Sequence, residues 1–399
     1  MQTEKRNVLV LATCQTLLLI NNSTVLAVNA LAGRHLAELR GFGDAFATVP
    51  VTAWIIGTAL ATVPAAQLMR RYGRRFGFTT GALLGVAGAL MASAALYLQS
   101  FALLSAGTLV FGTYNGFAQQ YRFAAADAAP LDRRAKAISY VLAGGLLGGL
   151  IGPQLSNVTV DLFATEYLGA YLVLVVFLVA AASLLQLLSI PLPSTLRSEE
   201  PARPLRHIAR QPAFIVAVLG GALGYAVMNL LMVATPLAMT GAAGHAYHTA
   251  AGVISAHVVA MYAPSFFTGT LIRRFGPLAV MFTGAVLQSG TVLIALSGVS
   301  VTHFVFALVL LGVGWNFLYI GATTLLTECY TPSEGAKVQG TNELLISSLM
   351  VVTSFSSGFL LAMEGWNLLN YVSSLLIAIV AVAIVWLMLR QRAQAPVPI

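Results

Sequence analysis

Two short apolar stretches carry the side chains whose types and spacing could do chemistry. Met228 and Met232 lie four residues apart, and so do His257 and Met261. In a helix this spacing places both members of a pair on one face, one turn apart. If the two helices run antiparallel from a loop near residue 244, Met232 lies level with His257, and Met228 lies level with Met261.

Soft neutral donors of this kind favour copper. Copper, above all Cu(I), accepts thioether and imidazole together, whereas Mg²⁺, Ca²⁺ and Zn²⁺ have little affinity for a thioether. The spacing therefore predicts a copper site made of Met228, Met232, His257 and Met261. The alternative is that the flexible methionines fill gaps between apolar helices. A histidine in hydrocarbon is costly and usually functional, which favours the site.

Three further side chains could assist such a site. Met239 lies seven residues after Met232, near the same face, although Pro236 between them is expected to kink the helix. His245 and His248 lie in the connecting loop, where they could collect metal at the entrance or remain solvated. We treat Met239, His245 and His248 as auxiliary candidates.

The elements that position these side chains are membrane helices. Of the 399 residues, 58% are hydrophobic and 9% are charged, and the mean hydropathy is +0.85. Soluble domains carry about a quarter charged residues. Apolar runs of sufficient length predict twelve membrane spans, approximately at residues 8–31, 46–69, 76–98, 101–124, 136–159, 168–190, 213–239, 248–271, 277–297, 303–326, 337–361 and 367–389.

Basic residues indicate how these spans are oriented. Of the 21 lysines and arginines, all but Arg34 and Arg40 fall on one side of the predicted spans. The positive-inside rule then places both termini in the cytoplasm, with the chain crossing a bacterial inner membrane. The net charge of +8 is accounted for by this asymmetry and by contact with anionic lipid of the bilayer, so we expect no nucleic-acid partner.

An internal repeat divides the chain. Basic residues and a glycine follow both the second and the eighth span: Arg70, Arg71, Gly73 and Arg74 in the first copy, and Arg273, Arg274 and Gly276 in the second. The glycines lie 203 residues apart (276 − 73). These segments resemble the Gly-x-Leu-x-Asp-Arg-x-Gly loop motif of the major facilitator superfamily, although Arg70 and Arg273 stand in place of its aspartate.

The resemblance implies an all-α polytopic membrane protein with 12 transmembrane helices in two six-helix halves, the major facilitator fold. It also implies alternating access, with the repeated loop as a gating element. We expect an N-terminal half at residues 1–190, a cytoplasmic linker at 191–212 and a C-terminal half at 213–399 that carries the copper site. Subtracting 203 from the four ligand numbers gives Val25, Asn29, Trp54 and Thr58, so the first half has no equivalent soft ligands.

A closer resemblance concerns the paired motifs themselves. MxxxM on the seventh helix, and HxxxM on the eighth helix followed by Tyr262-Ala-Pro-Ser265, are similar to the CcoA-type copper importers of this superfamily. That resemblance implies import of copper, as Cu(I), to supply cytochrome oxidase maturation. Copper would be the transported substrate and not a cofactor, and a copper chaperone or an oxidase assembly factor would be a partner.

Other polar residues were weighed beside this site. Glu343 in span eleven is a candidate for proton coupling, because carboxylates inside membranes are costly and usually functional; the alternatives are solvation at the cytoplasmic edge or pairing with Lys337. Cys14 and Cys329 lack a CxxC partner and are expected to be small buried residues. The sequence has no phosphate-binding glycine loop, HExxH motif or serine-histidine-acid grouping outside the spans, so we do not expect an enzyme.

Two other functions remain open. In the first, the protein transports a small organic compound or drug, and the methionines form a polarizable apolar wall. In the second, it is a copper sensor or a membrane partner of an oxidase assembly factor and transports nothing. Copper-independent binding of an organic compound would indicate the first function, and copper binding without copper flux would indicate the second.

Overall fold

Every regular element that the computed structural model describes is a helix. The description covers residues 2–39, 41, 49–160, 162–191, 203–241 and 243–394. The α-helices are α1 (Gln2–Leu39), α2 (Val49–Tyr72), α3 (Arg74–Tyr97), α4 (Phe101–Ala118), α5 (Tyr121–Ala128), α6 (Arg134–Thr159), α7 (Leu168–Leu185), α8 (Leu205–Ile208), α9 (Pro212–Thr240), α10 (Tyr247–Tyr262), α11 (Ser265–Phe275), α12 (Pro277–Ser297), α13 (Val301–Thr327) and α14 (Gly335–Gln394). A short 3₁₀ helix, η2 (Leu131–Arg133), precedes α6.

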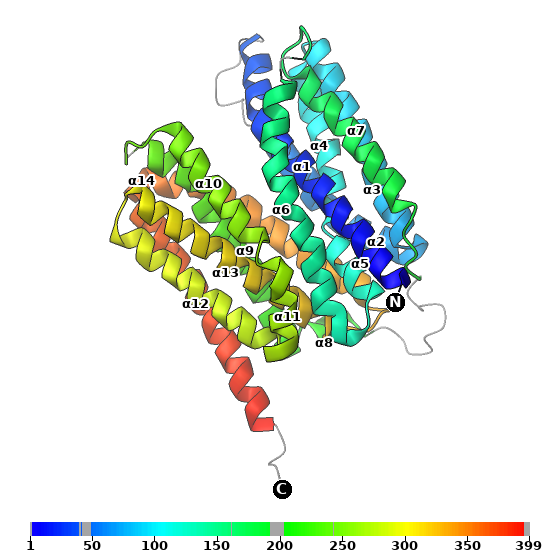
Figure 1. Cartoon of the computed structure of the whole chain (residues 1–399), viewed down its shortest axis with the longest axis vertical. Helices are drawn as coiled ribbons and strands as arrows, with labels where there is room; N and C mark the ends of the chain where they lie inside the picture. The colour runs from blue at the N-terminus through cyan, green and yellow to red at the C-terminus, as the bar shows by residue number, and fades with distance from the viewer. Residues whose placement is uncertain are drawn as a thin grey trace. The chain divides into compact units, whose positions relative to one another are not determined.

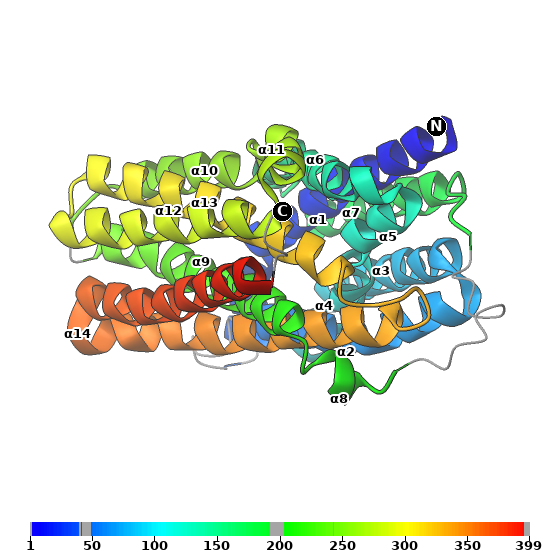
Figure 2. The same cartoon turned by 90° about the horizontal axis from the view of Figure 1, so that it is seen from below.

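Ten helical segments of the described chain are long and apolar enough to cross a membrane. Two of them belong to α14, whose arms Gly335–Leu361 and Gly365–Gln394 turn back on one another (Figure 2). The turn coincides with Gly365, which has φ 74°. The two expected spans outside the ten are each divided: residues 101–124 fall in α4 and α5, and residues 248–271 fall in α10 and α11.

The break between α10 and α11 has a clear local cause. Pro264 has no N–H, so it cannot continue the hydrogen bonding of α10. Carbonyl groups beside the break are satisfied from other helices: Asn316 Nδ2 donates to the Met261 carbonyl oxygen over 2.7 Å, and the Ser139 hydroxyl donates to that of Ser265. The break is therefore stabilised by contacts from neighbouring helices, because buried backbone in a membrane needs hydrogen-bond partners.

Contacts divide the chain into two compact units. Unit 1 consists of Met1–Ala129, Gly144–Pro201 and Pro332–Ser347, and unit 2 of Pro130–Ala143, Ala202–Thr331 and Ser348–Ile399. Each unit thus includes a short segment from the opposite half of the sequence: the start of α14 belongs to unit 1, and the start of α6 belongs to unit 2. The sequence halves at 1–190 and 213–399 stay a prediction about the repeat, distinct from these units.

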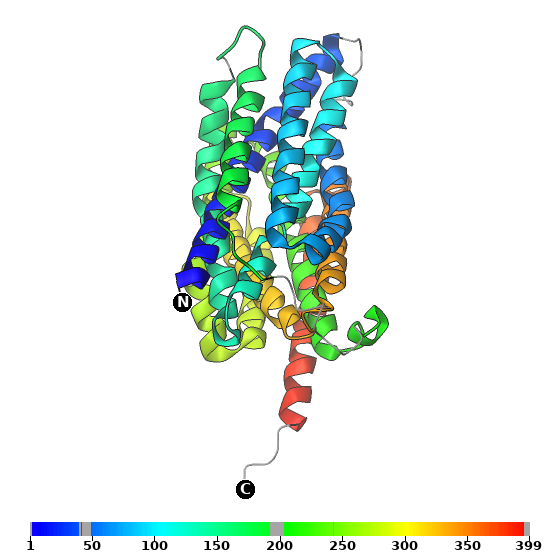
Figure 3. The same cartoon turned by 90° about the vertical axis from the view of Figure 1, so that its right-hand side faces the viewer.

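Within unit 1, α3 packs between α4 and α7, and α2 packs along α4. Figures 1 and 3 show α3 and α4 side by side over their lengths. Glycines permit this approach, since a Cβ added at Gly107 would lie 2.7 Å from the Ala92 nitrogen. Small residues at helix interfaces are the usual means of close packing in membranes, where hydrophobic burial between helices contributes little.

Within unit 2, α13 is the central helix. It packs against α9, α10 and α12 (Figure 1), and its side chains from Gly314 to Thr327 are all buried. A Cβ at Gly314 would lie 2.8 Å from the Gly284 carbonyl oxygen of α12. Side chains that project from α13 therefore meet three neighbouring helices of the same unit.

Candidate functional site

His257 lies in the seam between α10 and α13. Its Nδ1 is 2.7 Å from the Leu308 carbonyl oxygen. Because a carbonyl can only accept, Nδ1 carries the hydrogen, and Nε2 of the neutral ring is left as an acceptor. The side chain is 0% exposed, and Nε2 forms no hydrogen bond with the described residues. His257 is thus hydrogen-bonded to α13. The expected site involved only the helices that are α9 and α10 in the structure.

The methionines lie on the helices that their spacing predicts. Met228 and Met232 are on α9, Met261 is on α10, and these helices pack against each other in unit 2. Met228 and Met261 are buried, whereas Met232 is half-buried. Met239 is buried beyond Pro236. Among the residues that the structure describes, no group of three or more His, Cys, Asp or Glu side chains is arranged to hold a metal ion; thioethers are not among those ligand types.

The loop histidines have separate surroundings. His245 is half-buried, and its Nε2 donates to the Val299 carbonyl oxygen over 2.8 Å. Its ring also meets Phe304 edge to face, with centroids 6.2 Å apart. The side chain of His248 lies outside those that the structure describes. His245 is therefore tied to the loop before α13.

Four aromatic rings meet where α9, α10 and α13 come together. Trp315 and Tyr319 of α13 stack at 4.9 Å and 18°. Tyr225 of α9 packs edge to face on both, at 5.4 Å from each, and Tyr262 of α10 packs on Trp315 at 5.8 Å. Trp315 is 2% exposed, and its Nε1 forms no hydrogen bond with the described residues. We call these four rings the aromatic cluster.

The aromatic cluster was not predicted from the sequence. Its members come from three helices, and no single stretch contains them all. The available signal was the spacing of Trp315 and Tyr319, which lie four residues apart and so on one face of an apolar helix.

Unit 1 repeats the backbone geometry of this seam. A Cβ at Gly312 would lie 2.8 Å from the His257 carbonyl oxygen. In unit 1 a Cβ at Gly112 of α4 would collide with the Trp54 carbonyl oxygen of α2. Trp54 and His257 are 203 residues apart (257 − 54), and the two glycines are 200 apart (312 − 112). The repeat inferred from the loop motif thus extends to helix packing.

The side chains at the repeated positions differ. The same offsets relate Asn22 to Tyr225 (225 − 22 = 203) and Asn115 to Trp315 (315 − 115 = 200). In unit 1, Asn22 Nδ2 donates to Asn115 Oδ1 over 2.9 Å. In unit 2, the equivalent pair is two aromatic rings in an edge-to-face contact. One half therefore presents amides where the other presents rings.

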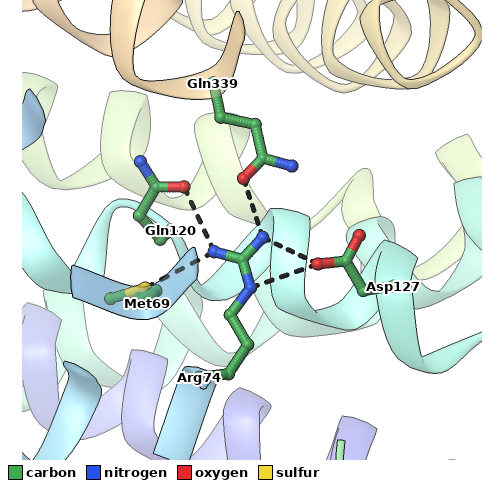
Figure 4. A network of polar contacts seen from close by, with 5 residues as sticks. All are labelled: Met69, Arg74, Gln120, Asp127 and Gln339. Atoms are coloured by element: carbon green, nitrogen blue, oxygen red, sulfur yellow. Dashed lines mark hydrogen bonds and ion pairs between the residues drawn. The ribbon is translucent and has the colours of Figure 1, made fainter. Parts of the chain in front are cut away.

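The repeated loop contains one buried arginine. Arg74 donates to Asp127 Oδ2 through Nε and Nη2, at 3.1 and 2.7 Å, and through Nη2 to Gln339 Oε1 at 2.7 Å (Figure 4). Its Nη1 lies 3.4 Å from Gln120 Oε1 and 3.4 Å from Met69 Sδ. All of these residues belong to unit 1. The network joins the start of α3 to α14.

The other loop residues set the turn and remain at the surface. Gly73 and Gly276 have φ 91° and 81° at the starts of α3 and α12, a region that side chains with a Cβ rarely adopt. The arginines before them are exposed: Arg70, Arg71, Arg273 and Arg274. The second copy has Pro277 in the place of Arg74, so the buried network belongs to the first copy.

Glu343 is paired inside unit 1. Its carboxylate accepts from Arg122 Nη2 and from Asn342 Nδ2 at 2.9 Å. Glu343 is 0% exposed and Arg122 is 3% exposed, so solvation at the membrane edge, one of the expected alternatives, is wrong. The guanidinium also lies over the Phe123 ring, 4.7 Å from its centroid. The pairing could not be predicted from a local sequence pattern, because Arg122 lies on α5 and Glu343 lies on α14.

Comparisons with known proteins now define the class. The Major Facilitator Superfamily model matches residues 11–237 and 217–399, and the chain belongs to this superfamily. It is 40% identical to the riboflavin transporter RfnT of Brucella anthropi, over 97% of this chain and 96% of that one. It is 29% identical to the uncharacterized transporter YdeG of Bacillus subtilis, over 90% and 88% of the two chains.

Solved structures agree on the fold. The E. coli fucose:proton symporter FucP aligns with TM-score 0.75 and 15% identity, over 96% of this chain and 99% of that one. The proton:xylose symporter XylE aligns with TM-score 0.79 and 14% identity, over 96% and 95%. These likenesses confirm the predicted fold class, a twelve-helix major facilitator protein. The protein is a multi-pass membrane transporter and not an enzyme.

The prediction of a copper importer is contradicted. The full-length relative at 40% identity is a riboflavin transporter, which points to a small organic compound, and the relatives give no support to a CcoA-type resemblance or to copper transport. The physical reason for the error is that methionine suits two roles: the same unbranched thioether that ligates copper also packs against rings and fills irregular gaps. The expectation of an organic substrate fits the comparisons better.

Proposed function

We propose that this protein carries a flat aromatic organic solute across the membrane by alternating access, with riboflavin as the first compound to test. The observation that carries this proposal is the 40% identity, over 97% of the chain, to a protein named as a riboflavin transporter. The buried aromatic cluster of unit 2 supports it, because flat heterocycles bind by stacking on aromatic side chains.

The proposed substrate site combines the aromatic cluster with the residues first singled out by their spacing. Stacking of a ring on an aromatic side chain contributes about 1–3 kcal/mol in nucleic-acid complexes, and thioethers add favourable contacts with rings. In this proposal Met228, Met232 and Met261 form a polarizable apolar wall, and His257 supplies a polar group. Three residues near the connection between α9 and α10 remain auxiliary candidates: Met239, His245 and His248.

The proposed gate uses the polar networks of unit 1. Alternating access requires the sequence halves to move against one another. Arg122 and Glu343 come from opposite halves, as do Arg74 and Gln339, so these contacts must separate and re-form during transport. Protonation of Glu343 would neutralise its charge and weaken the pair, which makes it the proposed coupling group. The exposed arginines of the repeated loop, with Gly73 and Gly276, would complete the gate.

We further propose a bacterial inner-membrane location with both termini in the cytoplasm. All but two of the 21 basic residues fall on the side that this topology makes cytoplasmic, as the positive-inside rule requires. Anionic lipids are the partners that this surface favours. With copper transport contradicted, a copper chaperone is no longer expected as a partner.

Uptake of radiolabelled riboflavin into proteoliposomes tests the function. The unaltered protein should accumulate riboflavin, and Trp315→Leu, which removes the central ring of the cluster, should lower uptake at subsaturating substrate about tenfold or more, as expected for a lost stacking contact. Leu293→Ala is the control, because Leu293 is 71% exposed on α12 and should leave uptake unchanged. Failure of the unaltered protein to take up riboflavin would overturn the proposal.

A further inference from the structure

Two polar atoms in the α10–α13 seam of unit 2 form no hydrogen bond with the described residues: His257 Nε2 and Trp315 Nε1. Both side chains are almost fully buried, at 0% and 2% exposure. A buried polar atom without a partner costs about 1–3 kcal/mol, and hydrocarbon provides no compensation. Such atoms need a partner that the described residues do not supply, such as a water, an ion or a ligand.

The two atoms have opposite chemistry. The bond from His257 Nδ1 to the Leu308 carbonyl oxygen, 2.7 Å long, fixes the hydrogen on Nδ1 and leaves Nε2 as an acceptor. The indole nitrogen of Trp315 can only donate. Leu308 and Trp315 are seven residues apart on α13, two turns along one face. The seam therefore carries one acceptor and one donor that have no partner among the described residues.

Two side chains beside these atoms could be displaced by a ligand. Met261 lies one turn after His257 on the same face of α10, and its unbranched thioether side chain adapts readily to a new neighbour. Tyr225, which packs edge to face on Trp315, is half-buried and is the more accessible ring of the cluster. If a ligand ring displaced Met261 and Tyr225, it would contact the other rings of the aromatic cluster and the two polar atoms.

We propose that His257 and Trp315 read the polar edge of the transported ring system, an inference that rests on the proposed function. His257 Nε2 accepts a hydrogen bond from a ring N–H, and Trp315 Nε1 donates one to a ring carbonyl. The imide edge of a flavin, in which one N–H lies between two carbonyl groups, has the matching chemistry. The aromatic cluster supplies ring affinity, and these two atoms supply selectivity for heterocycles with an N–H and a carbonyl on one edge.

Binding of riboflavin and of 3-methylriboflavin to the purified protein tests this assignment, with flavin fluorescence as the readout. The methyl group removes the imide hydrogen and keeps the ring system. We expect the unaltered protein to bind the methylated compound about tenfold more weakly, the loss typical of a buried hydrogen bond. His257→Leu should bind riboflavin about tenfold more weakly and should no longer distinguish the two compounds.

Two conservative variants sharpen the test. His257→Gln keeps an acceptor in the side chain and should restore part of the discrimination between the two flavins. Trp315→Phe keeps a ring and removes only the donor, so it should weaken binding of both flavins by the same factor. His207→Leu makes the same exchange at an exposed histidine on α8 and should bind both flavins as the unaltered protein does.

The outcomes separate this inference from the function beneath it. Riboflavin binding by His257→Leu with the discrimination intact would show that the methyl group acts by size alone, and would overturn the role of His257 while the proposed function stands. No flavin binding by the unaltered protein would overturn both. Thermal unfolding of each variant identifies any that fail to fold, and His257→Gln then decides the outcome for His257.

Discussion

The α2–α4 seam of unit 1 and the α10–α13 seam of unit 2 share one backbone design and differ in chemistry. Gly112 and Gly312 each let two helices approach until backbone touches backbone. Beside these seams, unit 1 carries the amide pair Asn22–Asn115 between α1 and α4, and unit 2 carries the ring pair Tyr225–Trp315 between α9 and α13. The repeat has kept the positions that decide how closely helices pack, and has changed the side chains that a substrate could touch.

The two units also differ in the buried charged residues that they carry at equivalent positions. Arg74 and Arg122 of unit 1 are buried and paired with carboxylates. Counting by the repeat offsets, the equivalent positions in unit 2 are Pro277 (74 + 203) and Ala322 (122 + 200). Unit 1 is thus held by charged contacts that protonation can weaken, whereas at these positions unit 2 offers no charge to titrate. We propose that proton coupling belongs to unit 1 and ring binding to unit 2.

The largest expected effect comes from breaking the buried ion pair. Glu343→Gln leaves Arg122 charged and buried, and removing one partner of such a pair costs about 3–5 kcal/mol. We expect a lower free energy of unfolding, measured by denaturant titration in detergent. The double variant Arg122→Met with Glu343→Leu removes both charges and should recover most of the loss. A Glu343→Gln protein as stable as the unaltered one would contradict the pairing.

The shared glycines should respond unequally. Gly112→Ala forces a Cβ into the Trp54 carbonyl oxygen, and Gly312→Ala places one 2.8 Å from the His257 carbonyl oxygen. Overpacking of this kind costs about 1–3 kcal/mol, and we expect the larger loss of stability for Gly112→Ala. Gly252→Ala in α10 is the matched control, because a Cβ there meets nothing within 4 Å. Equal thermal midpoints for all three variants would argue against the close approach in both seams.

Substitutions in the amide pair of unit 1 and the ring pair of unit 2 should have different effects on stability and on binding. Asn22→Leu removes the 2.9 Å bond to Asn115 and should lower stability by about 1 kcal/mol. Tyr225→Leu removes the edge-to-face contacts with Trp315 and Tyr319 and should weaken flavin binding by about a factor of ten, whereas Asn22→Leu should leave flavin binding unchanged. Thermal unfolding and flavin fluorescence on both proteins check this. If Asn22→Leu impaired flavin binding as much as Tyr225→Leu, the assignment of ring binding to unit 2 would fail.

The smallest effect concerns the thiol at the end of α13. Burial raises the pKa of Cys329 to about 12, and the nearby Glu328 charge adds to the shift. A raised pKa leaves little thiolate at pH 8, so in a Cys14→Ser background Cys329 should react slowly with iodoacetamide and faster as the pH rises. Glu328→Gln removes the neighbouring charge, lowers this pKa and should increase the rate modestly. A pH profile centred near the ordinary thiol value of about 8.5 would contradict the burial.

Much of the fold followed from local patterns in the sequence. The two loop copies predicted equivalent turns, and Gly73 and Gly276 do adopt nearly the same φ. Apolar runs predicted the membrane helices, yet the break at Pro264 was not anticipated, although the proline that causes it was visible. Spacing also placed the methionines and His257 correctly on α9 and α10. It could not choose between copper and an organic ring, because thioethers suit both.

The functional contacts were harder to foresee because they join distant segments. Arg122 and Glu343 are 221 residues apart, and the aromatic cluster draws on three helices. A contact between distant helices leaves no repeating pattern in the local sequence, so the residues near Arg122 do not indicate that Glu343 is its partner. Only the assembled helices show that each charge has a partner.

That separation has a consequence for biogenesis. At synthesis rates of about 5–20 residues per second, the 221 residues between Arg122 and Glu343 take roughly 10–45 seconds to make. During that interval an arginine close to the membrane interior lacks its carboxylate, so the first half must wait at the insertion machinery, or near lipid headgroups, for a late segment of α14. Unit 1, although it starts at the N-terminus, is completed only when the eleventh span arrives.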